Sequence, residues 1–485
     1  MRKGEIYELQ VTDLSTDGRG IGRADGMVTF VPGLVPGDAA RVEVTKVKKH
    51  IAEGRTEELL DPSPHRVEVP CRYFSQCGGC AMQSLDYGFQ VDLKNDQVRS
   101  QMQRLYGGPL PEFDEPVGME HPWRYRNKTE YGLFAGSVLT EEKTGTAYNT
   151  GKLRVGYYDR GSGKVTDVRE CLLQSEAAEM AAYGLRRYIR ESGMTVYDPK
   201  TRRGKLRRMI VRTGFSSGEV MVILVVNGKK IKNPELLAEI LDEAVTGSGE
   251  FELCSIVIEY NTNRNVAVPG KFEVIAGHRT IRDTVAGLEL EISPQSFYQV
   301  NPEMMEPLYR TVLEYAELNG SEVIYDLYCG AGTIGLFCAE HAKYVWGIET
   351  VEQAILDANR NAVLNGAVNI QFLHGKAEEK IHELLEHSVR PDVVILDPPR
   401  SGCKPELMET ILQTGPEKII YVSCDPATQA RDLRILAPEG GDYRVARIRV
   451  IDQFCHTMRT EAVVLLSRRE SADTADTAVH NLRKY

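Results

Sequence analysis

The sequence predicts an α/β fold with a Rossmann-like parallel sheet in its C-terminal third, preceded by a small β-barrel and an α+β domain. From about residue 291 onward, apolar strands alternate with helical segments, which is typical of a parallel sheet covered by helices. Residues 1–60 instead alternate apolar and polar positions between glycine-rich turns, which indicates a small antiparallel barrel. The residues between these parts show strands and helices without one dominant period, as in an α+β domain.

The length of 485 residues is too great for one ordinary core and predicts several domains. We place a barrel at 1–61, a central α+β domain at 62–290, the α/β domain at 291–468 and a flexible polar tail at 469–485. A helix expected near 85–107 belongs to the central segment by sequence, but it is a candidate to pack on the α/β domain.

Composition and charge exclude several classes of protein. Hydrophobic residues make up 42% and charged residues 26% of the chain, and no apolar run is long enough for a signal peptide or a membrane span. A cytoplasmic protein with no membrane partner is therefore expected. The net charge of −10 argues against an indiscriminate nucleic-acid binder, because the phosphate backbone rewards clustered Lys and Arg.

Three local basic clusters remain as candidate RNA contacts in this acidic chain. They are Arg41 with Lys46, Lys48 and Lys49, then Arg124 with Arg126 and Lys128, and the run RRGKLRR at 202–208. For each cluster, a solvated face without a partner is an equally good interpretation.

The N-terminal segment has the composition of a barrel that binds nucleic acid. It runs YELQVTDL, DGRGIGRADG, MVTFVPGLVPGD and ARVEVTKVKK. Gly18, Gly20 and Gly22 are expected at turns or bulges rather than in a nucleotide loop, because no helix follows them. A five-stranded, OB-like barrel of this size is a common platform for oligonucleotides, so the segment predicts RNA binding.

The ten cysteines are spaced unevenly along the chain. Cys71, Cys77 and Cys80 fall within ten residues, whereas the others are scattered. A disulfide framework is not expected in a reducing compartment, and a tight triplet there indicates metal binding.

The α/β segment contains a glycine turn of the kind that approaches a ligand closely. DLYCGAGTIG at 326–335 ends a strand and opens a helix, and Glu349 ends the next strand. An acidic residue at about 20 residues' distance is suited to bind a ribose diol. The three glycines of this turn also have G-x-G-x-x-G spacing, so spacing alone does not exclude a dehydrogenase.

A second turn, LDPPR at 396–400, distinguishes these possibilities. It follows a later parallel strand, at the edge of the sheet where ligands collect in open α/β folds. Proline restricts both itself and the residue before it, which holds Asp397 toward a planar substrate or cofactor. A rigid corner between strand and loop is the alternative without function.

A cysteine follows the next apolar strand, in YVSCDPATQARDL. Cys424 is expected at the same edge of the sheet, although a buried core cysteine is the common alternative. A nucleophile is favoured, because the residue stands at a strand end beside the ligand site expected at the glycine turn. Glu461 and His456, close together near the C-terminus, are the candidates for a base that works with this nucleophile.

Together these motifs resemble those of the RNA uracil-5-methyltransferase family of transfer-RNA and ribosomal-RNA enzymes. The matching segments are SPQSFYQVNP (293–302), DLYCGAGTIG, DPPR, SCDPATQARDL, HTMRTE, WRYRNK (123–128) and the cysteine triplet. The N-terminal barrel is similar to the TRAM domain of this family, so the likeness covers nearly the whole chain. The resemblance implies an enzyme that transfers a methyl group from S-adenosyl-L-methionine to C5 of a uridine in RNA.

The resemblance also assigns roles to residues. It implies that Cys424 is the nucleophile and Glu461 the base. It further implies four contacts to S-adenosyl-L-methionine: Gln299, Tyr328, Glu349 and Asp397. One position departs from the family pattern, because Arg459 stands where a second histidine is common in the final motif. The hydrogen bonding around Glu461 is therefore not predicted.

A fourth cysteine completes the triplet in family members that carry an iron–sulfur cluster, and Cys171 in DVRECLLQ matches that position. The resemblance thus implies a [4Fe–4S] cluster on Cys71, Cys77, Cys80 and Cys171, although four thiolates alone suit zinc equally well. The expected role is structural, because methyl transfer from a sulfonium needs no electron transfer.

The expected RNA is 23S ribosomal RNA, because simpler transfer-RNA enzymes of the family commonly lack the barrel and the cysteines. A uridine of the tRNA T-loop is the alternative substrate. The target base must be extruded, and Phe297 and Tyr298 are candidates to stack on it. An amino- or cytosine-methyltransferase, which does not need Glu461, and a non-catalytic RNA-binding factor, which does not need Cys424, are further alternatives. No obligate protein partner is expected.

Overall fold

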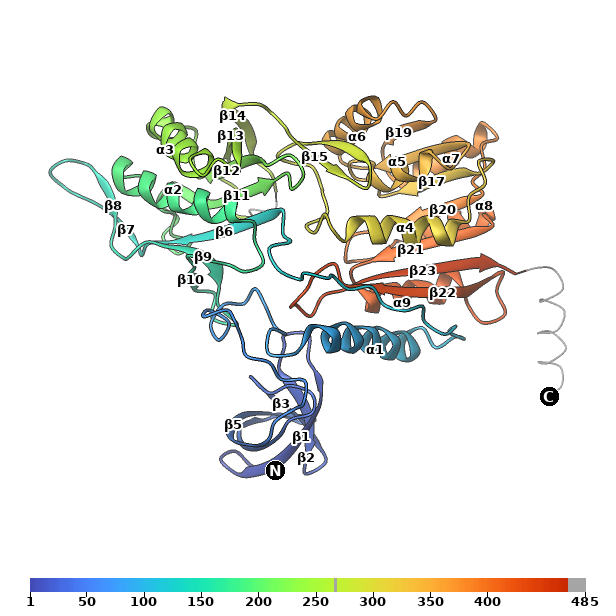
Figure 1. Cartoon of the computed structure of the whole chain (residues 1–485), viewed down its shortest axis with the longest axis horizontal. Coiled ribbons are helices and arrows are strands. Elements are labelled where there is room, and N and C mark those ends of the chain that lie inside the picture. Colours follow the sequence, from blue (N-terminus) through green and yellow to red (C-terminus); the bar gives the residue numbers. More distant parts are fainter. Residues whose placement is uncertain (266–267, 470–485) are drawn as a thin grey trace.

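The computed structural model describes residues 1–265 and 268–469, which form a body with a small barrel projecting from it (Figure 1). Five strands close the barrel in the order β1-β2-β3-β5-β4. They are β1 (Ile6–Leu14), β2 (Gly20–Ala24), β3 (Met27–Val31), β4 (Ala39–Val47) and β5 (Ile51–Asp61). Leu9, Val11 and Val42 point into the barrel core, because alternate residues of a strand share one face. The closed barrel confirms the OB-like barrel expected from the sequence.

A buried carboxylate fastens the barrel to the segment that leaves it. Asp38 accepts hydrogen bonds from Arg66 Nε at 2.7 Å and Arg66 Nη2 at 2.6 Å. It also accepts the backbone N–H groups of Val35 at 2.7 Å and Ser63 at 3.0 Å. Burial alone would raise the pKa of Asp38, but these hydrogen bonds hold that pKa below its usual value.

One long helix links the barrel to the body. α1 (Tyr87–Leu105) begins at Asp86, whose side chain accepts the Phe89 N–H and caps the helix. In Figure 1 the helix lies between the barrel and the C-terminal sheet, where it contacts α9 and β22.

The central domain is built on a seven-stranded sheet of order β10-β9-β6-β11-β12-β13-β14. Its strands are β6 (Lys128–Phe134), β9 (Arg154–Tyr158), β10 (Val165–Asp167), β11 (Leu206–Thr213), β12 (Glu219–Val226), β13 (Glu252–Tyr260) and β14 (Lys271–Gly277). The remaining elements are α2 (Glu176–Ser192), α3 (Pro234–Thr246), β7 (Val138–Thr140) and β8 (Ala147–Asn149). Strands β12 and β13 are parallel and the other neighbours antiparallel, which agrees with the expected α+β class.

The C-terminal domain carries the seven-stranded sheet β19-β18-β17-β20-β21-β23-β22. Its strands are β17 (Val323–Leu327), β18 (Tyr344–Glu349), β19 (Ile370–His374), β20 (Val393–Leu396), β21 (Lys418–Ser423), β22 (Tyr443–Ile451) and β23 (Glu461–Arg468). Strands β17 to β21 are parallel, whereas β23 lies antiparallel between β21 and β22. This parallel core confirms the Rossmann-like sheet expected from the sequence.

Helices cover both faces of this sheet. They are α4 (Met305–Ala316), α5 (Thr333–Ala339), α6 (Glu352–Leu364), α7 (Ala377–Glu386), α8 (Pro405–Thr414) and α9 (Pro426–Leu436). Residues of α4, α5 and α6 share one hydrophobic cluster that continues into the central domain, and residues of α1, α7, α8 and α9 share another. The hairpin of β15 (Ile281–Val285) and β16 (Leu288–Ile292) contacts β12 and α6 and so joins the two domains.

The described residues end just after β23. Arg469 donates its backbone N–H to Asp442 O at 2.7 Å, and the rest of the tail expected at 469–485 lies outside the described residues. No helix within 1–265 or 268–469 is long and apolar enough to cross a membrane.

We expect Asp38→Ala to lower the free energy of unfolding of the barrel by about 3 kcal/mol, because it leaves Arg66 and two N–H groups without their acceptor. Amide hydrogen exchange of β1 to β5 in increasing urea measures this loss. Asp61→Ala, at the exposed end of β5, is the matched control and should change the free energy by less than about 0.5 kcal/mol. Equal effects of the two substitutions would contradict the role given to Asp38.

Candidate active site

The C-terminal sheet reverses the direction of its connections between β17 and β20, where open α/β sheets bind their ligands. The chain leaves β17 toward β18 and β19 on one side and later forms β20 and β21 on the other. Two turns border this crevice at the carboxyl ends of the strands: the glycine turn after Leu327 and the 397–400 turn after Leu396. Asp397 N donates to Leu327 O at 3.4 Å, which joins the two turns.

The glycine turn has a backbone that few side chains tolerate. Gly330 and Gly332 have φ angles of +54° and +80°, and Tyr328 has a φ of +65°. A Cβ on Gly332 would lie 2.5 Å from the Phe372 ring, so a larger residue does not fit at this start of α5. The glycines therefore allow the backbone after β17 to turn tightly beside the crevice.

Two carboxyl groups lie at this turn. Asp326 is buried and accepts the Gly335 N–H at 2.9 Å through Oδ2, while its Oδ1 has no hydrogen-bond partner among the described residues. Burial, with a smaller contribution from Asp397, raises the pKa of Asp326 to about 8. Glu349, at the end of β18, accepts the Gly330 N–H at 3.3 Å, which orients its carboxylate at the turn. The Glu349 carboxylate also accepts the N–H groups of Thr350 and Val351, so Asp326 Oδ1 is the carboxyl oxygen at this turn that has no partner among the described residues.

The SPQSF segment passes beside the same turn. Two of its serine hydroxyls donate to the buried carboxylate of Asp357 in α6, and Asn127 Nδ2 donates to Gln299 O at 2.8 Å. A Cβ on Gly330 would lie 3.8 Å from the Phe297 side chain, so the segment adjoins the glycine turn. These contacts fix Gln299 and Phe297 near the crevice.

One cross-strand register brings the predicted nucleophile and base together. Ser423, the last residue of β21, lies opposite Ala462 in the antiparallel strand β23. Cys424 follows Ser423 and Glu461 precedes Ala462, so the two residues face each other at the carboxyl edge of the sheet. Cys424 is half-buried, and Glu461 is only 2% exposed.

Neighbouring charges act in opposite directions on the Cys424 thiol. Burial and the Glu461 carboxyl raise the pKa of the thiol, whereas a hydrogen bond from Arg400 and its positive charge lower it. Burial, followed by Asp397, raises the pKa of Glu461 well above its usual value. Burial also raises the pKa of Asp397 to about 7. Sequence reasoning did not assign Arg400 a role, although it stands in the DPPR motif.

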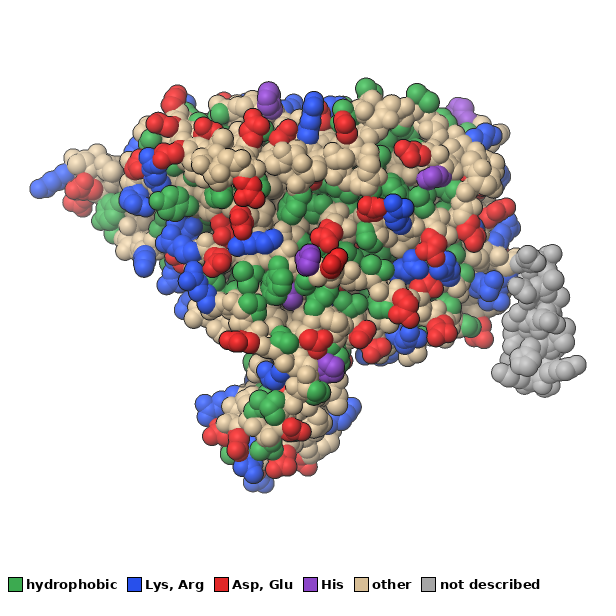
Figure 2. Space-filling model, in the orientation of Figure 1, with side chains coloured by type: hydrophobic (Ala, Val, Ile, Leu, Met, Phe, Trp, Pro, Cys, Tyr) green, Lys and Arg blue, Asp and Glu red, His purple; other side chains and the backbone are tan. Residues whose placement is uncertain are grey.

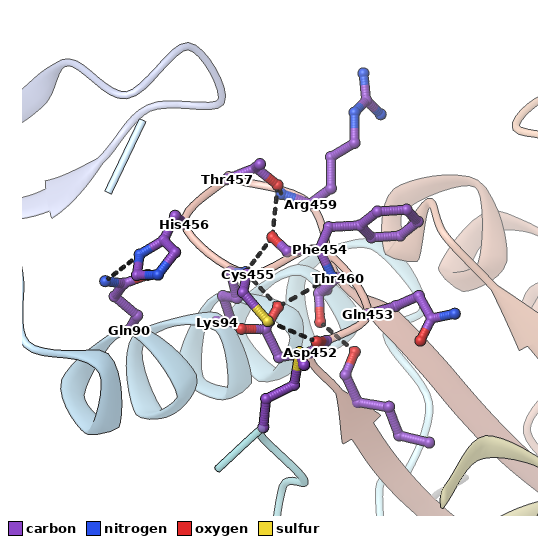
Figure 3. Close-up of polar contacts among 12 residues, drawn as sticks. Gln90, Lys94, Asp452, Gln453, Phe454, Cys455, His456, Thr457, Arg459 and Thr460 are labelled. Atoms are coloured by element: carbon purple, nitrogen blue, oxygen red, sulfur yellow. Dashed lines mark hydrogen bonds and ion pairs between the residues drawn. The ribbon is translucent and has the colours of Figure 1, made fainter. Parts of the chain in front are cut away.

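His456, the other candidate base, is turned away from this thiol. Its ring stacks on Trp123 with the centroids 3.8 Å apart, and its Nδ1 lies 3.2 Å from Gln90 Nε2. Burial lowers its pKa to about 4. Figure 3 shows His456 directed toward α1, whereas Arg459 extends from the other side of the same loop. Of the two candidates, Glu461 is the one that lies at Cys424.

The two aromatic candidates for base stacking differ in exposure. Phe297 is 63% exposed, whereas Tyr298 is 6% exposed and donates its hydroxyl to Asp283 at 2.9 Å. The expectation that Tyr298 stacks on RNA is wrong, because adjacent residues of an extended segment face opposite sides and Tyr298 faces the core.

The four predicted ligand cysteines line one cavity of about 60 Å³. Cys71, Cys77, Cys80 and Cys171 are all half-buried, and Arg126 lines the same cavity. Burial, followed by Cys171, raises the pKa of Cys80 to about 12. Within the described ranges, no three His, Cys, Asp or Glu side chains are gathered closely enough to hold one metal ion. The fold thus brings the distant fourth cysteine to the triplet without forming a site for a single ion.

A groove of about 1270 Å³ extends from Cys424 to the barrel. It lies among the barrel, the cysteine segment, α1 and the loop before β23. Five arginines line it: Arg19, Arg104, Arg126, Arg160 and Arg459. These residues come from five separate parts of the chain, so no local run of the sequence marks them.

Acidic neighbours pair with some residues of the basic clusters chosen from the sequence. Their ion pairs join Arg41 to Glu58, Arg124 to Glu179, Lys128 to Glu130 and Arg208 to Glu130. Figure 2 shows the same mixture over one face of the molecule, where Lys and Arg side chains alternate with Asp and Glu. Of the residues named in these clusters, Arg126 is the one that lines the groove.

We expect Arg400→Leu to move the alkylation of Cys424 to higher pH, because it removes the charge and the hydrogen bond that lower the thiol pKa. The iodoacetamide reaction of the Cys424 peptide, followed by mass spectrometry against pH, should show a midpoint raised by about one unit. Arg434→Leu, on the exposed surface of α9, is the control and should leave the midpoint unchanged. An unchanged midpoint in Arg400→Leu would show that Arg400 does not act on the thiol.

Known proteins resemble this chain over nearly its whole length. Residues 279–469 match the model of the tRNA (uracil-5-)-methyltransferase family, and residues 2–56 match the TRAM domain. An uncharacterized RNA methyltransferase of Clostridium tetani (strain Massachusetts / E88) is 38% identical over 96% of this chain and 97% of its own. Another from Halalkalibacterium halodurans is 39% identical over 96% of this chain and 98% of its own.

A solved structure supports the same relationship. The Pyrococcus abyssi tRNA (uracil-54, C5)-methyltransferase, in complex with S-adenosyl-L-homocysteine, matches with a TM-score of 0.70 and 29% identity. The match covers 94% of this chain and 99% of the other. It confirms the Rossmann-like methyltransferase fold. On the sequence and structural likeness together, the chain belongs to the tRNA (uracil-5-)-methyltransferase family and carries an N-terminal TRAM domain.

Proposed function

We propose that this S-adenosyl-L-methionine-dependent RNA methyltransferase acts on C5 of uridine through a covalent Cys424 adduct, with Glu461 as the base. The observation that carries the proposal is the β21–β23 register, which sets a half-buried thiol opposite a buried carboxyl group. Methylation of uracil at C5 requires both groups. C5 becomes nucleophilic only after a thiolate adds at C6, and the C5–C6 double bond forms again only after a base removes the C5 proton. An amino-methylating enzyme needs neither group, because its methyl acceptor is an exocyclic nitrogen; methylation of cytosine at C5 uses the same two groups and is separated by its product.

The bonds change in four steps. The Cys424 thiolate adds to C6, and the electrons of the C5–C6 double bond move toward O4 to give an enolate. C5 then attacks the methyl carbon of the sulfonium, whose carbon–sulfur bond breaks with its electron pair left on sulfur. C5 now carries the new methyl group and its original proton. Glu461 takes that proton, the double bond forms again and the Cys424 thiolate leaves.

The electrostatics of the site support these roles. The raised pKa of Glu461 makes its carboxylate a stronger proton acceptor than an exposed glutamate once it is ionised. Burial leaves the pKa of both Glu461 and Cys424 above its usual value, and Arg400 offsets part of that rise and so favours the ionised forms that the reaction uses. Bound S-adenosyl-L-methionine supplies the methyl group and adds a positive sulfonium charge, which favours the same ionised forms.

Four residues are proposed to hold S-adenosyl-L-methionine: Gln299, Tyr328, Glu349 and Asp397. The orientation of Glu349 at the glycine turn supports a role at the ribose hydroxyls, and the position of Gln299 supports one at the amino-acid portion. The unpartnered oxygen of Asp326 adds a polar group that sequence reasoning did not single out.

The proposed RNA is 23S ribosomal RNA, since the chain combines the barrel with the cysteine set. Transfer RNA is the second candidate, because the Pyrococcus abyssi enzyme that matches 94% of this chain acts on uracil 54 of tRNA. In either case the groove between Cys424 and the barrel suits a phosphate backbone, because five arginines line it. Phe297 is the proposed stacking partner of the extruded base, because its ring is 63% exposed beside the crevice.

We also propose that Cys71, Cys77, Cys80 and Cys171 hold a [4Fe–4S] cluster with a structural role. Arg126 in the same cavity would balance the negative charge of a cluster with four thiolates. In such a cluster each thiolate binds a different iron, so the sulfurs stand farther apart than the ligands of one zinc ion. The shared cavity supports one common ligand for the four cysteines, and the family resemblance favours iron–sulfur over zinc.

The function is tested by nucleoside mass spectrometry of ribosomal and transfer RNA from cells with and without this protein. We expect 5-methyluridine to disappear from specific 23S fragments in the deletion strain and to return with the wild-type gene but not with Cys424→Ala. Loss from the transfer-RNA fraction would instead select the second substrate. Restoration by Cys424→Ala would exclude the covalent mechanism, and loss of 5-methylcytidine would identify a different reaction.

Anaerobically purified protein should contain about four iron and four sulfide per chain and absorb visible light, as iron–sulfur clusters do. Cys171→Ser should lose both the metal and the absorption, because it removes one of the four ligands. Cys254→Ser is the matched control: Cys254 is buried on β13, away from the cavity, and its replacement should leave iron and sulfide unchanged. Zinc without sulfide in the wild-type protein would contradict the cluster.

A further inference from the structure

Helix α1 holds the loop that carries the proposed base. This loop, residues 452–460, joins β22 to β23 and ends immediately before Glu461 (Figure 3). Where the loop joins the two strands, Ile451 pairs with Glu461, and Thr460 Oγ1 donates to Ile451 O at 3.2 Å. A shift of the loop therefore moves the first residue of β23.

A buried ion pair fixes the start of the loop. Lys94 Nζ of α1 lies 2.5 Å from Asp452 Oδ1, and both side chains are 1% exposed. Lys94 also donates to Phe454 O at 3.1 Å, and Tyr87 OH donates to Asp452 Oδ2 at 2.9 Å. Two buried charges are stable only when each satisfies the other, so this contact specifies where the loop sits on the helix.

A second set of contacts fixes the middle of the loop. Gln90 lies four residues before Lys94 and three after Tyr87, so all three side chains share one face of α1. Gln90 Nε2 lies 3.2 Å from His456 Nδ1. The His456 carbonyl accepts the backbone N–H groups of Ala81 at 2.8 Å and of Met82 at 3.1 Å. His456 adopts a φ of +62°, a strained conformation that persists only where neighbours impose it.

Cys424 does not belong to this loop. It follows β21 and precedes α9, whereas Lys94 contacts the loop between β22 and β23. The nucleophile and the base of the proposed reaction are therefore held by different structural elements. The thiol that opens the reaction is carried by the parallel sheet, and the carboxyl group that completes it is carried by a hairpin held from α1.

We propose that Lys94 is a positioning residue for the base: through the Lys94–Asp452 pair, α1 holds the loop so that Glu461 reaches the C5 proton. This inference rests on the proposed function, in which Glu461 removes that proton. Without Lys94, attack and methyl transfer proceed but the enzyme stalls as a methylated Cys424–RNA adduct. A loss of general stability would instead lower adduct and product together.

The test uses the full-length protein, S-adenosyl-L-methionine and radiolabelled substrate RNA, and measures denaturation-resistant protein–RNA adduct and 5-methyluridine in the same reaction. For Lys94→Met we expect product release to fall about tenfold to a hundredfold, because a misplaced catalytic group loses that much. Adduct formation in the first turnover should stay within about twofold of the wild type, so the adduct accumulates. Tyr87→Phe, which removes one hydrogen bond to Asp452, should act in the same direction but less.

Arg186→Met is the matched control, because it breaks a partly buried ion pair with Asp167 in the central domain and touches neither the loop nor the site. It should leave the ratio of adduct to product unchanged. A wild-type ratio of adduct to product in both Lys94→Met and Tyr87→Phe would overturn the inference. An equal loss of adduct and product would overturn it as well. If Lys94→Met does not fold, the ratio in Tyr87→Phe alone decides. Glu461→Gln separates the two proposals: if it accumulates no adduct, the base assignment itself is wrong.

Discussion

The site depends on the register of one antiparallel strand pair. Strand β23 enters the parallel sheet in the opposite direction, with Ala462 opposite Ser423, so its first residue meets the residue that follows β21. In a wholly parallel sheet, the start of a strand would lie at the far edge from the ends of its neighbours. The reversal therefore brings Glu461 to Cys424 at the ligand edge, and a slip of one residue would turn these side chains to opposite faces.

Contacts from several other parts of the chain hold the region around Cys424 and Glu461 in place. The 397–400 turn contributes Arg400, which lowers the thiol pKa, and α1 holds the loop that leads into β23. The barrel reaches the same region through the cysteine segment: a Cβ on Gly18 would lie 2.7 Å from Ala81 Cβ, so the contact requires glycine there. Ala81 in turn donates to His456 O in the loop. The barrel and the loop that leads to Glu461 are thus joined by one continuous set of contacts.

Sequence reasoning predicted the features that local patterns determine. Alternating strands and helices identified the parallel sheet, and period-two alternation identified the barrel. The family resemblance assigned Cys424 and Glu461 the roles of nucleophile and base. It did not predict the features that depend on contacts between distant parts of the chain. Tyr298 faces the core, and Arg208 of one basic cluster pairs with Glu130 of another strand, which no local run of charges reveals. The groove arginines and the buried pair of Lys94 with Asp452 come from segments far apart in the chain.

The central claim, that Cys424 attacks the base and Glu461 removes its C5 proton, is tested most directly with RNA that carries 5-fluorouridine at the target. Fluorine replaces the proton that Glu461 must take, so the reaction should stop after methyl transfer. The account predicts a stable complex of one chain with one RNA, methylated at C5 and joined through Cys424 in the mass spectrum of the digested peptide. Absence of an adduct from an enzyme that methylates ordinary uridine, or attachment to another residue, would contradict the account.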